Sequence, residues 1–154
     1  MTTPLLSRFQ PMLGFWRGPN ELETGRRGLM EMHFQSHFEG EVVQLDAHTW
    51  DIATGETFSA GTGLFALGPD GRIIENLYVE RFGFCRLDET EDEPDVLALR
   101  GDLPDGFTMS VSLRLEADEL LLTSQLKSGV VGMDLPRTVA RLRRYDRQRG
   151  EGAK

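Results

Sequence analysis

Cysteine and histidine are scarce in this sequence of 154 residues, which holds one cysteine, Cys85, and three histidines. A lone cysteine cannot form an internal disulfide, and neither a CxxC nor an HExxH motif is present, so we predict no metal site. No stretch approaches the roughly 18 consecutive apolar residues that a membrane span needs. Residues 1–16 also lack a basic leader followed by a long apolar run, and we therefore expect a cytoplasmic protein.

Basic residues are outnumbered, with 17 Lys and Arg against 25 Asp and Glu and a formal net charge of −8. This charge works against attraction to nucleic acid or to anionic membrane surfaces. The sequence also lacks a recognisable serine nucleophile, and Gly61-Thr62-Gly63 lies inside an expected strand rather than in a phosphate-binding loop. We therefore predict no catalytic residue and no polyanionic partner.

What the sequence does contain is the pattern of an all-β protein after a short first segment. Residues 4–13 carry apolar side chains at helical spacing, which predicts one short amphipathic helix over an apolar opening. Beyond Gly14, segments of alternating polarity are separated by turn signals such as Glu39-Gly40 and Thr54-Gly55. The expected strands are residues 14–24, 28–38, 41–51, 56–66, 72–81, 82–88, 95–101, 107–116, 119–127 and 137–145.

Successive hairpins that share one apolar face are typical of a closed barrel. A sheet of about ten strands rarely stays open, and closure removes its exposed edges. We predict a single antiparallel up-and-down β-barrel of about ten strands with a short N-terminal helix. This barrel domain is expected to span residues 1–145, and residues 146–154 are expected to form a disordered polar tail.

The hairpin around Glu39-Gly40 separates an apolar face from a polar face. Side chains alternate along a strand, so a turn at these two residues fixes the cross-strand pairs. The expected inner pairs are Phe34–Leu45 and Met32–Ala47. The expected outer pairs are His33–Asp46 and Glu31–His48. Two histidines therefore each stand opposite a carboxylate on the face that we expect to meet water.

The next two strands are harder to orient. When the register is carried through Thr54-Gly55, the inner face of the following strand is expected to hold Phe58, Ala60, Thr62, Leu64 and Ala66. A bulged turn at residues 69–71 then turns inward Ile74, Asn76 and Tyr78. A turn longer or shorter by one residue would instead turn inward Ile73, Glu75, Leu77 and Val79. We favour the bulged turn by analogy with the similar turn at residues 104–106, and the choice decides whether a carboxylate lies inside.

A short helix, the motif Gly14-Phe15-Trp16-Arg17-Gly18 and a meander of hairpins together resemble the calycin superfamily of lipocalins and fatty-acid-binding proteins, over nearly the whole chain. The sequence is similar above all to bacterial barrels related to nitrobindin, which begin with a similar Gly-x-Trp-x-Gly, and to neighbouring lipocalin-like families. Residues 38–43 and 51–56 also resemble those neighbours. The resemblance implies that Trp16 closes the barrel base, with a late arginine such as Arg144 packed on it.

The ligand-binding residues of these families are not retained. Nitrobindins bind haem through a histidine near the last strand, whereas residues 135–142 contain none and the last histidine of the chain is His48. We therefore expect no haem and no other cofactor. Fatty-acid-binding proteins hold a carboxylate with Arg-x-Tyr on the final strand, which residues 143–145 match literally. Alternation nevertheless turns Ala140 and Leu142 inward and leaves those residues outside.

The predicted function is the binding of a small apolar molecule, such as a fatty acid, an isoprenoid or an aromatic metabolite, in the barrel lumen. Methionines adapt to varied ligands, and a few polar groups can fix a ligand's orientation. The residues expected to contact the ligand are Met32, Phe34, Leu45, Thr62, Asn76, Tyr78, Met109 and Ser124. A fully packed interior would give the same pattern of residues.

Two alternatives remain open. The barrel could be an enzyme of cyclase or isomerase type that uses Tyr78 or Glu75 as acid or base, and a raised pKa of an inward Glu75 would favour this. It could also be a filled barrel that acts as a homodimeric interaction protein. The apolar residues expected on its outer surface are Trp50, Ile73, Leu77 and Val79.

Overall fold

The computed structural model describes residues 3–90, 95–104, 106–129, 135 and 137–146. Within them, helix α1 (Pro4–Phe9) continues into the 3-10 turn η1 (Gln10–Met12), and a second 3-10 turn, η2 (Phe38–Gly40), joins two strands. The ten strands are β1 (Gly14–Leu22), β2 (Arg27–His37), β3 (Val42–Asp51), β4 (Thr57–Leu67), β5 (Ile73–Val79), β6 (Gly83–Glu89), β7 (Val96–Asp102), β8 (Phe107–Glu116), β9 (Glu119–Ser128) and β10 (Thr138–Arg144). The predicted tail lies outside the described residues from residue 147 onward.

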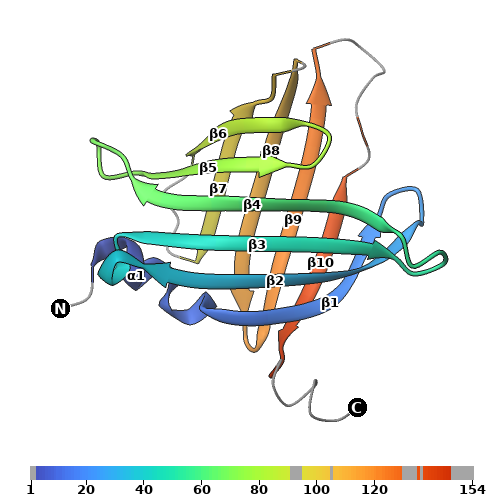
Figure 1. Cartoon of the computed structure of the whole chain (residues 1–154), viewed down its shortest axis with the longest axis horizontal. Helices are drawn as coiled ribbons and strands as arrows, with labels where there is room; N and C mark the ends of the chain where they lie inside the picture. Colours follow the sequence, from blue (N-terminus) through green and yellow to red (C-terminus); the bar gives the residue numbers. More distant parts are fainter. Residues whose placement is uncertain (1–2, 91–94, 105, 130–134, 136, 147–154) are drawn as a thin grey trace.

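The strands form one closed barrel in which each strand pairs with its neighbours in sequence and β1 pairs with β10, all antiparallel. In Figure 1, β1 to β6 run across the front of the molecule, and β7 to β10 cross behind them at a steep angle. The predicted up-and-down barrel with a short N-terminal helix is confirmed. No helix in the described part of the chain has the length and apolar character to cross a membrane.

Helix α1 closes one end of the barrel. Its cap residue Thr3 accepts a hydrogen bond from the Leu6 amide at 3.0 Å and donates one to the Gly40 carbonyl oxygen at 2.6 Å. Through Thr3, these two bonds fasten the helix to turn η2. Phe9 is fully buried, with its ring centroid 4.6 Å from that of Phe65. The helix therefore fills this end of the lumen with its apolar face.

Trp16 joins the same end of the barrel to the last strand. Its ring is buried, its Nε1 donates a hydrogen bond to the Met12 carbonyl oxygen at 2.8 Å, and the Arg144 guanidinium lies 4.5 Å from the ring centroid. Arg144 also donates hydrogen bonds to the carbonyl oxygens of Leu13 and Pro11. The expected packing of Arg144 on a base-closing Trp16 is confirmed.

The register of β2 and β3 agrees with the sequence analysis at every predicted pair. Phe34 stands opposite Leu45 and Met32 opposite Ala47 on the inner face. On the outer face, the pairs are His33–Asp46 and Glu31–His48. Alternation and the short turn were sufficient to fix this hairpin.

The prediction for β4 is wrong because a β-bulge shifts its register. Thr49 pairs with Ser59 and Trp50 pairs with Thr57, so Phe58 is an extra residue on β4. One added residue exchanges the two faces of a strand. Leu64 is consequently 44% exposed and Phe65 only 1%. Gly61 and Gly63, expected outside, stand opposite the inward Ala47 and Leu45, whereas Thr62 lies on the outer face beside Asp46.

The exchange passes to β5, because that strand pairs in register with β4. Glu75 stands opposite the inward Phe65, and Tyr78 stands opposite the outward Thr62. The buried residues of β5 are Ile73, Glu75 and Leu77. The favoured inward placement of Ile74, Asn76 and Tyr78 is therefore wrong, and the alternative that brings a carboxylate inside is correct.

The corrected register also removes part of the apolar surface proposed for a homodimer, since Ile73 and Leu77 are buried.

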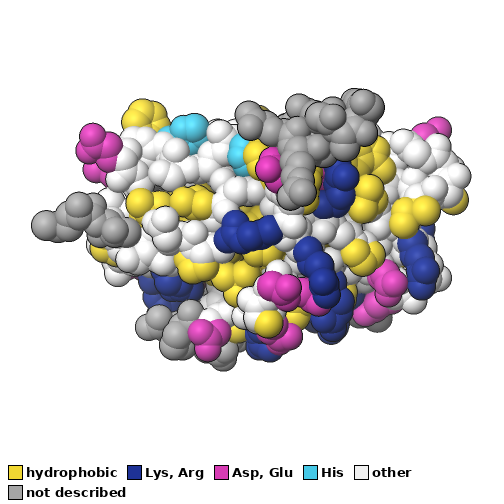
Figure 2. All heavy atoms as spheres, turned by 90° about the horizontal axis from the view of Figure 1, so that it is seen from below, with side chains coloured by type: hydrophobic (Ala, Val, Ile, Leu, Met, Phe, Trp, Pro, Cys, Tyr) yellow, Lys and Arg dark blue, Asp and Glu magenta, His cyan; other side chains and the backbone are white. Residues whose placement is uncertain are grey.

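On the face shown in Figure 2, basic and acidic side chains lie side by side among small apolar areas. Arg141 and Arg143, both exposed, pair with Glu119 on the neighbouring strand. Their outward orientation is as expected from the sequence.

Candidate functional site

The lumen is filled at the helix end and hollow at the other. A cavity of about 580 Å³ lies in this second half. Its apolar wall includes Met30, Met32, Leu45, Ala47, Leu77, Val79, Met109, Val111, Leu122 and Leu126. Pockets that hold small ligands usually have about 300 to 1,000 Å³ and mostly apolar walls, so the size and lining suit such a ligand.

Four of the eight residues predicted to contact a ligand line this cavity: Met32, Leu45, Met109 and Ser124. Phe34 also points inward but lies deeper, in the filled half, with its ring 6.1 Å from that of Phe9. Thr62, Asn76 and Tyr78 lie on the outer face, because the bulge exchanged the faces of β4 and β5. Their expected place in the lumen is corrected, and with it their expected contact with a ligand there.

Glu75 is the charged residue that the corrected register adds to the cavity wall. Its side chain is 3% exposed, and burial raises its pKa from the ordinary 4.5 to about 8. The described residues offer its carboxyl group neither a hydrogen bond nor an ion pair. A carboxyl group in such a site keeps its proton at neutral pH, because the charged form has lost its hydration without replacement.

Two glycines of β4 make room for this side chain. A Cβ atom on Gly63 would overlap the Glu75 carboxyl oxygen Oε2, and Gly61 lines the cavity beside it. A glycine inside a strand commonly marks such a close approach. On the other side of β5, burial and then the charge of Glu75 raise the pKa of the inward Cys85. The carboxyl group thus lies between a glycine gap and a weakly acidic thiol.

Asn20, on β1, adds a second polar group to the wall. Its Nδ2 donates a long hydrogen bond of 3.5 Å to Thr49 Oγ1, and its Oδ1 is buried with no partner among the described residues. A buried acceptor without a donor costs about 1 to 3 kcal/mol. Both Asn20 and Glu75 therefore present unsatisfied oxygen atoms within the lumen wall.

The mouth of the cavity carries charged groups of both signs. Arg26 donates a hydrogen bond to Asp51 at 2.6 Å, and its guanidinium lies 4.5 Å from the Phe58 ring centroid. Arg26 and its partner Asp51 therefore neutralise each other at one side of the opening. Glu80 and Arg81, both exposed, lie at the other side.

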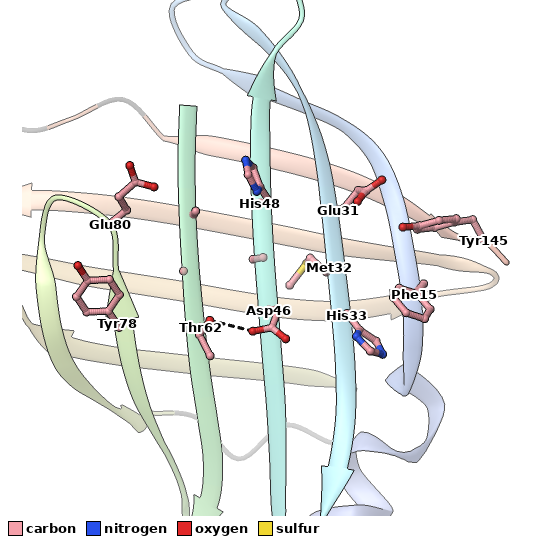
Figure 3. Close-up of a pocket in the computed structure, with 13 residues that line it drawn as sticks. Phe15, Glu31, Met32, His33, Asp46, His48, Thr62, Tyr78, Glu80 and Tyr145 are labelled. Atoms are coloured by element: carbon pink, nitrogen blue, oxygen red, sulfur yellow. Dashed lines mark hydrogen bonds between the residues drawn. The ribbon is translucent and has the colours of Figure 1, made fainter. Parts of the chain in front are cut away.

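A second hollow, of about 440 Å³, lies on the outer face of β2, β3 and β4. Figure 3 shows the side chains that line it, with Thr62 donating a hydrogen bond to Asp46. His48 is hydrogen-bonded to Thr57 Oγ1 at 2.9 Å, and the His33 ring stacks on Phe15 at 3.7 Å. Within the described residues, no group of three or more His, Cys, Asp or Glu is placed to hold a metal ion.

Glu75 was expected inside only under the less favoured register, which the enzyme alternative used, and Gly63 and Asn20 were not expected as site residues. The signal that could have found them is the pair of glycines at alternate positions, 61 and 63, within a strand. Such a pair indicates that something bulky packs against one face of the strand. The register carried through Thr54-Gly55 places these glycines outside, because it does not include the bulge at Phe58.

Comparison with known proteins supports the fold. No protein-family model matches the sequence, and no curated protein is significantly similar to it. Among solved structures, Rv2717c from M. tuberculosis is similar at a TM-score of 0.75 with 21% identity, over 95% of this chain and all of that one. The redesigned β-barrel b11L5F_LGL is similar at a TM-score of 0.54 with 15% identity, over 95% of this chain and all of that one.

A third solved structure, the redesigned β-barrel mFAP1 bound to DFHBI, has a TM-score of 0.50 and 14% identity, over 88% of this chain and 96% of that one. At these identities the similarity concerns the path of the chain and not the side chains of the site. This chain is a closed, ten-stranded antiparallel barrel, and its fold is similar to that of those structures.

Proposed function

We propose that this protein binds a small, mainly apolar molecule in the half-open lumen of a calycin-like barrel. The observation that carries the proposal is the cavity of about 580 Å³ with a mostly apolar wall. Burial of apolar ligand surface contributes about 25 cal/mol per Å², so a ligand that buries roughly 200 Å² gains about 5 kcal/mol before the costs of association. The fold similarity to mFAP1, a designed barrel that binds DFHBI, supports the proposal.

Haem, which the nitrobindin resemblance would imply, does not fit this chain. The sequence contains three histidines, at positions 33, 37 and 48. His33 and His48 lie on the outer face of β2 and β3, and His37 is hydrogen-bonded there to Gln44. No histidine is available to ligate an iron inside the lumen. The proposed ligand is therefore bound without haem.

Filling the cavity is expected to abolish binding. In Val111→Trp the indole would occupy the lumen, because Val111 lines the cavity. The matched control is Ser110→Trp, which adds the same ring to the exposed face of the same strand. Nile red fluorescence titrations of the two variants and the wild type measure the dissociation constant. We expect at least about tenfold weaker binding for Val111→Trp alone.

Equal affinity in the wild type and Val111→Trp would show that the dye binds outside the lumen and would contradict the proposal. Native mass spectrometry of the freshly purified protein, beside a denatured sample, complements the titration. A consistent extra mass in the native sample would identify the class of ligand that the barrel carries.

A second candidate function is proton-transfer catalysis, which the raised pKa of the inward Glu75 specifically favours. The probe 5-nitrobenzisoxazole opens when a base removes its C3 proton, the N–O bond breaks, and the electron pair leaves on oxygen as a phenolate. We expect the rate to rise with pH and to level off above about 8, as Glu75 ionises. Glu75→Gln should abolish this rate, and the control Glu116→Gln, at an exposed residue that does not line the cavity, should retain it. A rate in Glu75→Gln equal to the wild-type rate would rule out Glu75 as the base.

A further inference from the structure

The cavity wall is apolar except at a few points, and its one buried carboxyl group has no partner among the described residues. Glu75 projects from β5 into the gap left by Gly63. An unpaired carboxylate in such a place is costly, and this cost is relieved when a cation pairs with it. The site therefore has the charge and the space for a positively charged group that the described residues do not supply.

The other ionisable groups around Glu75 do not fill this role. On β6, Cys85 is a weak acid with a pKa raised by burial, and Glu89 lies at the helix end, 3.1 Å from Arg8. On β4, Phe65 stands opposite Glu75 and Gly63 lies beside its carboxyl group, and the residues of β2 and β8 that line the cavity are apolar. At the mouth, Arg26 is engaged by Asp51, while Glu80 and Arg81 are exposed.

We propose that the ligand of this lumen is a lipophilic amine, whose ammonium group pairs with Glu75 while its apolar body lies against the methionine and leucine side chains of the cavity. This inference rests on the proposed function and names the class of its ligand. An ammonium group also brings more than one N–H donor. Asn20 Oδ1, in the wall of the same cavity, is an acceptor without a partner among the described residues. Like Glu75, it therefore favours a ligand that donates hydrogen bonds.

The same geometry disfavours a fatty acid. A carboxylate deep in the lumen would lose its hydration without gaining a positive partner, and above about pH 8 it would also meet the ionised Glu75 as a like charge. A carboxylate held at the mouth by Arg81 would leave its apolar tail against Glu75, and the buried carboxyl group would remain without a partner. Charge complementarity thus selects an amine over an acid with the same chain.

A matched series of ten-carbon probes tests the proposal, namely decylamine, decan-1-ol and decanoate, each titrated by isothermal calorimetry. We expect decylamine to bind at least about tenfold more tightly than decanol, and decanoate to bind more weakly than both. Glu75→Gln should remove the preference for the amine while leaving decanol affinity unchanged. Val111→Trp should abolish amine binding, which separates the lumen from the acidic outer surface. Glu116→Gln, which changes an exposed residue that does not line the cavity, should retain it.

The pH dependence gives an independent readout. Below about pH 8 the empty site holds a protonated Glu75, so binding of an ammonium ion must release that proton. Decylamine affinity should therefore rise by up to about tenfold per pH unit between pH 6 and 8 and level off above. Calorimetry in buffers of different ionisation enthalpy measures how many protons are released when decylamine binds. We expect no such release in Glu75→Gln.

The outcomes separate the inference from the proposed function. If decanol and decanoate bind in the lumen and the amine gains nothing from Glu75, the inference is overturned and the proposed function stands. A Glu75-dependent preference for decanol would assign the carboxyl group as a donor to a neutral ligand and would also overturn the inference. If none of the three probes binds, both are contradicted.

Discussion

Replacement of Glu75 by glutamine is expected to make the protein more stable at alkaline pH, with an effect that grows from pH 4.5 to about pH 8. Below pH 4.5 the carboxyl group is protonated in both the folded and the unfolded chain. Between pH 4.5 and about 8 the unfolded chain releases the proton and the folded chain keeps it, because burial raises the folded-state pKa to about 8. The free energy of unfolding of the wild type therefore falls as the pH rises through this range, by up to about 5 kcal/mol in total.

Urea denaturation at pH 4.5, 6.5 and 8.5 measures this effect as the difference in free energy of unfolding between the wild type and Glu75→Gln. The difference should change by several kcal/mol in favour of the variant across that range. Glu80→Gln, at the exposed mouth, should follow the wild type within about 0.5 kcal/mol. Parallel curves for the wild type and Glu75→Gln would show that Glu75 is not buried in the folded protein.

The second large effect is expected for Trp16→Ala, with a loss of about 4 kcal/mol in the free energy of unfolding. The change removes a fully buried ring, its hydrogen bond to Met12 and the surface on which Arg144 packs. These contacts join η1, β1 and β10, so the loss opens the barrel where its first and last strands meet. The cavity left behind lies at the filled end of the lumen, away from the ligand site.

The matched control is Trp50→Ala, because Trp50 is half-buried on the outer side of the barrel, stacked on His48 at 4.1 Å. It should cost less than about 1 kcal/mol. Far-UV circular dichroism in urea is the appropriate measurement, since removing a tryptophan alters fluorescence directly. Similar losses for the two variants would contradict the structural role assigned to Trp16.

The part of the site that could be predicted from the sequence is the part built on regular hairpins. Met32 and Leu45 lie on β2 and β3, where alternation and a short turn fix every pair, and both line the cavity. Met109 and Ser124 lie on β8 and β9, whose turn at Ala117-Asp118 pairs Glu116 with Glu119 without interruption. Where no residue is added, local pattern decides which side chains face the lumen.

The part that could not be predicted follows from one extra residue. The set Phe58, Ala60, Thr62, Leu64 and Ala66 is more apolar than the set that contains Gly61 and Gly63, so hydrophobicity assigns it to the interior. The structure reverses this, because the bulge at Phe58 exchanges the two faces of β4, and the inward Gly63 then leaves room for the Glu75 side chain. A glycine leaves space because it has no side chain, and a pattern of hydrophobic residues does not reveal that space.

The sequence by itself determined the class of the fold, the order of its strands and the helix at one end, because each depends on local alternation and turn residues. The position of Trp16 beneath Arg144 was implied by the resemblance that the Gly14–Gly18 motif carries. The tertiary structure alone decided that Glu75 lies inside, that Tyr78 lies outside and that half of the lumen is hollow. These features depend on a bulge between Thr49 and Trp50 and on how side-chain volumes from distant strands fill a closed barrel. Neither the bulge nor that sum of volumes is encoded in the polarity of neighbouring residues.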